Sequence, residues 1–199
     1  MSKLKVDQIS KATGAAPAIF TLPAADGTAG QMMKTDGSGQ LGWATDSSGK
    51  VLQMVYMYTG AYATGSTTMP FDDTIPQNTE GNEVMTLAIT PTSASSKLLI
   101  NVDVCGSSDV QGNWTAALFR DSTADALTAT QVKASNYSPD QNDHCHLSWV
   151  ADSSSTSATT FKVRCGQHNA GSWYFNGENG SRLFGGVANS GITIMEISA

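Results

Sequence analysis

The feature that most constrains the fold is a repeated alternation of apolar and polar side chains with a period of two residues. It is clearest in "KLLINVDVCG" at 97–106, where one face would carry Leu98, Ile100, Val102 and Val104. Successive side chains of a β-strand point to opposite faces of its sheet. The segment is therefore predicted to be a strand with one face buried in a core.

About eight strands of this kind are expected, separated by clusters of Ser, Thr, Asn, Asp and Gly. The other seven lie at 51–58, 83–90, 114–121, 144–151, 159–166, 172–177 and 191–198. The connection "PTSASS" at 91–96 predicts a hairpin between its flanking strands. The only helical candidate is a turn near 124–132. The predicted fold class is all-β, with a jelly-roll-like antiparallel β-sandwich.

The first 50 residues have a different composition, dominated by Gly, Ala, Ser, Thr and Asp. Here "QMMKT" and "QLGWA" flank "DGSG", a pattern that predicts a short hairpin. A lone hairpin is only marginally stable in water because it buries too little apolar surface. We therefore expect other copies of the chain to supply that surface in a closed ring, with Met32, Met33, Leu41 and Trp43 around the axis. The alternative is a flexible linker.

Charge and composition exclude several classes of partner and cofactor. The chain has 199 residues and a net charge of -6, with scattered Lys and Arg, so no nucleic-acid surface is expected. No run of about 18 apolar residues occurs, so membrane insertion is not expected. The N-terminal segment lacks the apolar stretch of a secretory signal. Cys105, Cys145 and Cys165 are predicted to be buried thiols, with a Cys145–Cys165 disulfide as the alternative.

Catalytic and metal-binding motifs are scarce. The sequence "GSGQLG" at 37–42 lacks the strand and helix of a dinucleotide site, and no nucleophile-elbow or zinc-protease motif occurs. We therefore expect no enzyme activity, no cofactor and no metal. His144 and His146 would share one face of a strand, so three copies could offer six ligands around an axis. A solvated strand edge is the favoured interpretation of this pair.

Aromatic residues beside amides are the better indication of a binding surface. Trp114 follows Asn113, and Trp173 and Tyr174 precede Asn176. Flat rings next to amide groups can stack on sugars and bond their hydroxyls. These five residues are therefore the predicted receptor contacts, with a glycan as the ligand. In the alternative interpretation Trp173 and Phe175, which alternate together, belong to the core, and at most one ring lies at the surface.

The N-terminal segment, in particular "LPAADGTAGQMMKTDGSGQLGWA" at 22–44, resembles a phrase of tailed-bacteriophage tail fibres and related virion appendages, "LPxxDGTxGQxLxTDGxGxLxW". The second half, including "ITPTSASSKLLINVDV" and "GITIMEIS", resembles a β-sandwich module at the ends of such fibres. The resemblance implies a homotrimer made in host cytoplasm and exposed on the virion.

The same resemblance implies three parts. Residues 1–20 would attach to other tail or capsid proteins, 21–50 would form an intertwined neck, and 51–199 would be the head. The implied function is a short tail fibre whose head contacts a host surface glycan or protein. The alternatives are a capsid head fibre or decoration protein and, less favoured, a polysaccharide depolymerase.

Overall fold

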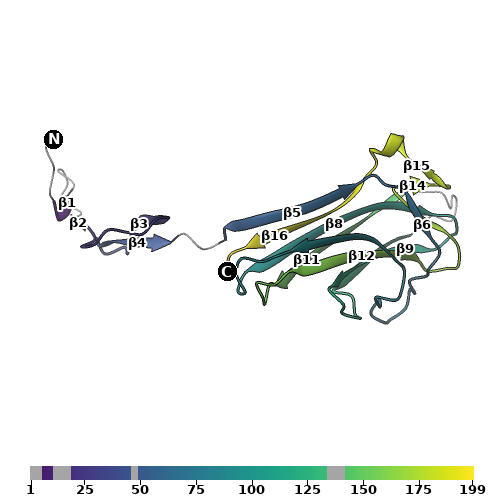
Figure 1. Ribbon diagram of the computed structural model, residues 1–199, viewed down its shortest axis with the longest axis horizontal. Helices are drawn as coiled ribbons and strands as arrows, with labels where there is room; N and C mark the ends of the chain where they lie inside the picture. The colour runs from purple at the N-terminus through teal and green to yellow at the C-terminus, as the bar shows by residue number, and fades with distance from the viewer. Residues whose placement is uncertain (1–5, 11–18, 46–48, 134–141) are drawn as a thin grey trace. The chain divides into compact units, whose positions relative to one another are not determined.

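A computed structural model describes residues 6–10, 19–45, 49–133 and 142–199 (Figure 1). The chain divides into two compact units, Met1–Lys50 and Val51–Ala199, called unit 1 and unit 2 below. Within the described ranges the only helical element is a short 3-10 turn, η1 (Phe184–Gly186). None of the described helical structure is long and apolar enough to cross a membrane. Most of the segment predicted to attach to a virion, 1–20, falls outside the described residues.

Unit 1 consists of two antiparallel hairpins, and the second confirms the hairpin predicted around "DGSG". Strand β1 (Gln8–Ser10) pairs with β2 (Ile19–Thr21), and β3 (Gln31–Thr35) pairs with β4 (Leu41–Thr45). Asp36 closes the β3–β4 turn, because its Oδ1 accepts the backbone N–H groups of Ser38 at 2.8 Å and Gln40 at 3.1 Å. Hydrogen bonds from Ser38 lower the pKa of Asp36.

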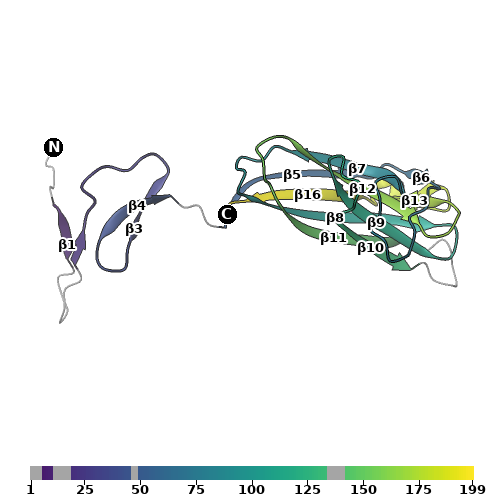
Figure 2. The same cartoon turned by 90° about the horizontal axis from the view of Figure 1, so that it is seen from below.

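Unit 2 is a sandwich of two antiparallel sheets (Figure 2). The four-stranded sheet has the order β10-β9-β12-β7, and the six-stranded sheet has the order β5-β16-β8-β13-β6, with β11 paired to the other edge of β8. The four-stranded sheet consists of β7 (Asn82–Ile89), β9 (Asn113–Arg120), β10 (Thr128–Lys133) and β12 (Thr159–Gln167). The six-stranded sheet consists of β5 (Val51–Thr59), β6 (Ala63–Gly65), β8 (Lys97–Ser108), β11 (Asp143–Asp152), β13 (Trp173–Phe175) and β16 (Ser190–Ile197). A small separate pair is β14 (Gly177–Glu178) with β15 (Ser181–Arg182).

The core is formed by the inward faces of both sheets, as the alternation predicted. Strand β8 buries Leu98, Ile100, Val102 and Val104, and these belong to one cluster with Phe161 of β12. Burial of each such side chain stabilises the fold by about 1.5 to 3 kcal/mol. The all-β sandwich is therefore confirmed for the described residues.

Two local predictions are wrong. The strands flanking "PTSASS" do not form a hairpin, because β7 lies in the four-stranded sheet and β8 in the six-stranded sheet. Alternation identifies a buried face, but it does not identify the partner strand. The expected helical turn near 124–132 is occupied mainly by strand β10, an edge strand paired with β9.

The crossing from β7 to β8 is held by a buried carboxylate. Glu196 accepts the backbone N–H groups of Thr92 at 2.9 Å and Ser93 at 3.1 Å, the hydroxyl of Ser96 at 2.5 Å and the amide of Gln53 at 2.6 Å. Burial alone would raise the pKa of Glu196. The hydrogen bonds from Ser96, Gln53 and the backbone outweigh burial and lower the pKa to about 2.

The three cysteines are free and buried, which confirms the prediction of buried thiols. Burial raises the pKa of Cys145 to about 12 and raises the pKa values of Cys165 and Cys105 as well. Reactive cysteines have a lowered pKa, so burial shifts all three thiols in the opposite direction.

We predict that Glu196→Gln lowers the free energy of unfolding at neutral pH by about 2 to 3 kcal/mol, because charge-assisted hydrogen bonds are lost. The folded pKa of about 2 lies below the ordinary value of 4.5, so this stabilisation is complete above pH 4.5 and is lost as the pH falls toward about 2. The difference between wild type and variant should therefore shrink over that range. Urea unfolding at several pH values measures it, with Glu178→Gln as the control. A constant difference would contradict the assignment.

Candidate functional site

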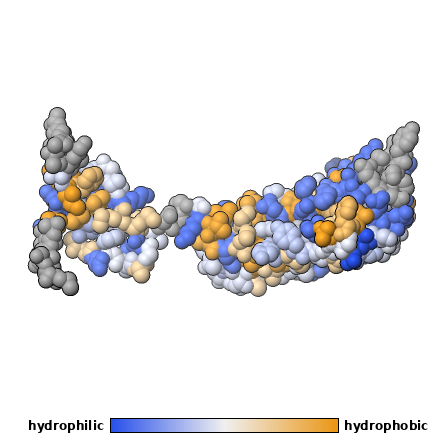
Figure 3. Space-filling view, turned by 90° about the horizontal axis from the view of Figure 1, so that it is seen from above, coloured by the Kyte–Doolittle hydropathy of each residue, from blue (hydrophilic) through white to orange (hydrophobic). Residues whose placement is uncertain are grey.

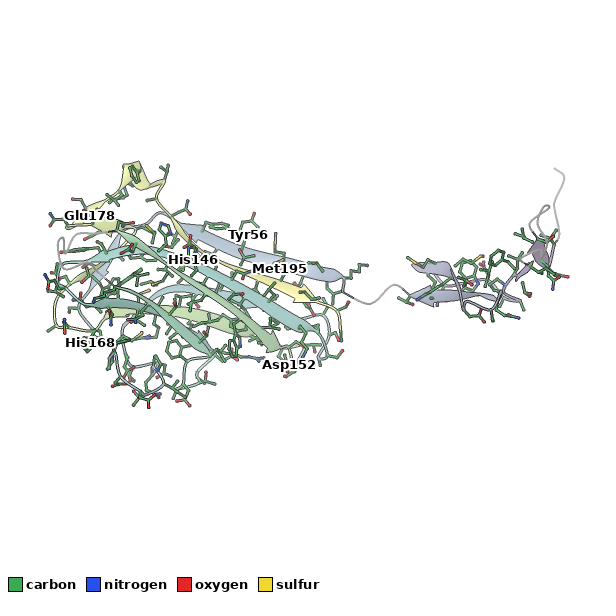
Figure 4. The ribbon with its side chains drawn as sticks, turned by 180° about the vertical axis from the view of Figure 1, so that it is seen from behind. Tyr56, His146, Asp152, His168, Glu178 and Met195 are labelled. Atoms are coloured by element: carbon green, nitrogen blue, oxygen red, sulfur yellow. The ribbon has the colours of Figure 1, made fainter. Side chains whose placement is uncertain are left out.

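The outward face of the six-stranded sheet is open to solvent on β5, β16, β8 and β11. Paired residues form cross-strand rows on it, because the four strands are in register. One row is largely apolar and consists of Met54, Met195, Leu99 and Val150. The next row consists of Tyr56, Thr193, Asn101 and Ser148, and the third of Tyr58, Gly191, Asp103 and His146. Apolar and polar side chains are thus separated along the strands, and Figure 4 labels one residue of each row, Met195, Tyr56 and His146.

Tyr56 and Tyr58 dominate the β5 side of this face, and each is 62% exposed. The ring of Tyr58 lies across Gly191, where a Cβ atom would come within 2.3 Å of the ring. A hollow of about 310 Å³ lies beside the ring, lined by Asn101, His146 and Thr193 among others. Because Gly191 has no side chain, the ring of Tyr58 can lie over this position on the neighbouring strand.

A His-Asp-His cluster occupies that polar end. The Nδ1 atoms of His144 and His146 lie 3.0 Å and 3.3 Å from Oδ1 of Asp103. The two imidazole rings are stacked, with centroids 6.0 Å apart and planes 19° apart. The predicted pair of histidines on one strand face is confirmed, and the structure adds Asp103 from the neighbouring strand.

The structure places two of the predicted receptor-contact residues in the interior. Trp114 is 2% exposed and Trp173 is 1% exposed, and both belong to the core between the sheets. Their rings are on the inward face of β9 and β13, where alternation with Phe175 places Trp173. For Trp173 the alternative interpretation, a core residue, is the one that the structure shows.

Asn176 is also buried, and its side-chain amide makes three hydrogen bonds within the fold. Its Nδ2 donates to the carbonyl oxygens of Thr59 at 2.7 Å and Ala61 at 3.1 Å, and its Oδ1 accepts the hydroxyl of Ser190 at 2.7 Å. The residue has a positive φ of 53°, a conformation that asparagine tolerates better than most residues. Asn176 therefore ties the end of β5 to the start of β16 and leaves no amide group for a ligand.

Asn113 and Tyr174 remain partly exposed among the five predicted contacts. Tyr174 points to the opposite face of β13 from Trp173, and its ring is stacked on that of Tyr62 with centroids 6.4 Å apart. The structure does not bring Asn113 into this aromatic pair. Of the five predicted ligand contacts, only Asn113 and Tyr174 are therefore partly exposed, and they lie at separate positions.

The predicted shaft residues lie on the β3–β4 hairpin of unit 1. Met32 and Met33 are about half exposed, whereas Leu41 and Trp43 are partly buried. The indole Nε1 of Trp43 donates to the carbonyl oxygen of Ala25 at 2.8 Å, and its ring covers Gly27, where a Cβ atom would be 2.6 Å away. Figure 3 shows apolar residues gathered on the visible surface of unit 1.

These features define a β-sandwich protein with an open, mixed apolar and polar sheet face. The family model of the Pgp3 C-terminal domain matches residues 68–199. The chain belongs to this family, which is named for a chlamydial virulence plasmid protein. A comparison with curated proteins found no match.

Several solved structures share a distant likeness. The Eiger TNF protein of S. frugiperda is 12% identical, with 73% of this chain and 93% of that chain covered and a TM-score of 0.45. The VP2 subviral particle of infectious bursal disease virus is 13% identical, with 79% of this chain and 35% of that chain covered and a TM-score of 0.37. Latent PorU of Porphyromonas gingivalis is 8% identical, with 80% of this chain and 14% of that chain covered and a TM-score of 0.38. Likeness at this level carries no information on function.

The family match corrects the resemblance to tailed-phage fibres. The shaft phrase at 22–44 lies outside the matched residues 68–199 and consists largely of turn residues, which recur wherever tight hairpins are needed. The predicted tail fibre, its capsid alternative and the virion location are therefore wrong. The attachment to tail or capsid proteins was implied by the same resemblance and is therefore no longer supported.

We predict that Trp173→Ala lowers the free energy of unfolding by about 3 to 5 kcal/mol, because it opens a large cavity in the core. Tyr174→Ala, next to it in sequence but on the other face, should cost much less. Chemical denaturation of both variants measures the difference. Equal losses would contradict the assignment of Trp173 to the core.

Proposed function

We propose that the chain is a non-enzymatic, homotrimeric binding protein that presents three jelly-roll heads to a ligand on host cells. Family membership supports a role as a secreted virulence factor. The raised pKa values of all three thiols argue against a cysteine nucleophile, which needs the opposite shift.

The observation that carries this proposal is the absence of a core in the described part of unit 1. None of its described residues is buried, although two hairpins form there. The exposed large apolar side chains in the two hairpins are Ile9, Ile19, Phe20, Met32 and Met33. Hairpins of this size need added apolar burial to be stable. Sister copies packed around a shared axis would supply it, and the number of copies that we propose is three.

The head offers a second apolar surface for such packing. The row of Met54, Met195, Leu99 and Val150 is continuous across four strands, and Tyr56 extends it along β5. Exposed patches of this kind mark association surfaces in soluble proteins. A sister copy resting on this row would bury it.

The strand order supports the jelly-roll assignment. Numbered in chain order, the eight long strands of the head are β5, β7, β8, β9, β10, β11, β12 and β16. In these numbers the two sheets read 1-8-3-6 and 2-7-4-5. This is the order obtained when an eight-stranded antiparallel ribbon wraps into two packed sheets.

Tyr174 and Asn113 are the residues that we retain for ligand contact. The stacked rings of Tyr174 and Tyr62 form a flat, partly exposed surface on which a sugar ring can lie. A single contact of this kind is weak. Three copies on one rigid assembly bind a cell surface about 10² to 10⁴ times more tightly than one copy.

The trimer is tested by the molar mass of the full chain, measured by sedimentation velocity and light scattering. We expect three times the mass of one chain for wild type, and a fall toward one chain for the double variant Met32→Glu and Met33→Glu, because charge is placed on the shared apolar surface. Lys34→Glu is the control, since it changes the charge of the same strand without removing an apolar group. A wild-type mass of one chain at micromolar concentration would refute the proposal.

Ligand binding is tested by the attachment of fluorescent protein to host cells before and after enzymatic removal of surface glycans. We expect Tyr174→Ala to weaken each site about 2- to 10-fold, the loss of one aromatic stacking contact. Phe184→Ala, another exposed aromatic residue, is the control. Attachment that is indifferent to both glycan removal and Tyr174→Ala would count against the glycan.

A further inference from the structure

We propose that Asp103, His144 and His146 form a binding site for a divalent first-row transition metal ion, with Zn²⁺ the best fit. The site goes beyond the proposed function. It does not depend on trimer formation, because one chain supplies all three ligands.

Strand pairing places the three ligands together. His144 and His146 are two residues apart on β11, so both project from the outward face of the sheet. Asp103 on β8 is directly opposite His146 and diagonal to His144. These are the two cross-strand positions from which side chains reach one another.

The distances suit tetrahedral coordination. Zn–N and Zn–O bonds of about 2.0 to 2.1 Å place neighbouring ligand atoms of a tetrahedron about 3.3 Å apart. The Nδ1 atoms of His144 and His146 lie 3.0 Å and 3.3 Å from Oδ1 of Asp103. One ligand atom from each residue lies within 4.8 Å of the other two.

The chemistry of the three ligand atoms, two imidazole nitrogens and one carboxylate oxygen, determines which type of ion the site prefers. Imidazole nitrogen is a poor ligand for Ca²⁺ and Mg²⁺, which prefer oxygen, whereas Zn²⁺, Cu²⁺ and Ni²⁺ bind it well. Two neutral imidazoles and one carboxylate offset one of the two positive charges. The remaining charge attracts an anionic or water ligand.

A fourth coordination position would face the hollow beside the cluster. His146 and Asp103 line this hollow together with Tyr58 and Thr193. The side chains of Asn101 and Ser148, which are joined by a hydrogen bond of 2.9 Å, also line it. Three protein ligands with one exchangeable position are typical of zinc sites that bind a further molecule. The hollow therefore gives a bound ion access to water or to a small oxygen ligand.

The test uses tag-free full-length protein, treated with chelator and titrated with ZnCl₂ by calorimetry and with Co²⁺ by visible absorption. We expect one ion per chain and a tetrahedral Co²⁺ spectrum. His144→Ala, His146→Ala and Asp103→Asn should each weaken binding at least about tenfold, because each removes or neutralises a direct ligand. All three residues are on the outward face, so thermal unfolding of the chelated variants should match wild type.

His168→Ala is the matched control, because His168 lies in a different part of the head, after β12, where its Nδ1 accepts the backbone N–H of Phe71 at 3.1 Å (Figure 4). It should bind metal as wild type does. The monomer-directed Met32 and Met33 variant should also retain one ion per chain, which separates this site from the trimer. No binding, binding unchanged by His146→Ala, or one ion per three chains would each overturn the proposal.

Discussion

The packing of the two sheets of the head against each other is the interaction on which the rest of the structure depends. Along 97–104 of β8 and 192–197 of β16 one face is buried and the other is at least partly exposed, so the period of two determines which residues face outward once the core is formed. Ile192 and Ile194 are buried, and therefore Thr193 and Met195 face outward. The apolar row, the tyrosines and the His-Asp-His cluster are all consequences of that one choice of buried face.

Unit 1 shows the opposite case, because its described residues form paired strands but no buried core. Its order rests on turn chemistry, such as the Asp36 side chain that closes the β3–β4 turn, and on one indole packed over Gly27. Local hydrogen bonds of this kind fix a shape, but they contribute little free energy compared with burial of apolar area. The division between the two units is thus a division between segments that can bury their own apolar groups and segments that cannot.

The sequence was sufficient to predict faces but not neighbours. Alternation predicted that Leu98 is buried and that His144 and His146 share a face, because both statements concern one strand. It could not pair β8 with β11, so Asp103 was not linked to the histidines, and it wrongly paired β7 with β8. The predicted aromatic contact surface was wrong for a related reason. Trp173 and Tyr174 are adjacent aromatic residues, but they point to opposite faces of β13, so Trp173 is buried and Tyr174 is partly exposed.

The outward face can carry an association surface and a metal site because they are separated along the strands. Leu99 of the apolar row and Asp103 of the cluster are four residues apart on β8, a distance of about 13 Å in a strand. Between them lie Thr193 and Asn101 of the second row, which are polar and can stay hydrated. A sister copy resting on the apolar row therefore does not need to cover the cluster. The ring of Tyr58 lies over Gly191 and beside the proposed metal ligands, where it forms one side of the hollow and leaves the fourth position open to solvent.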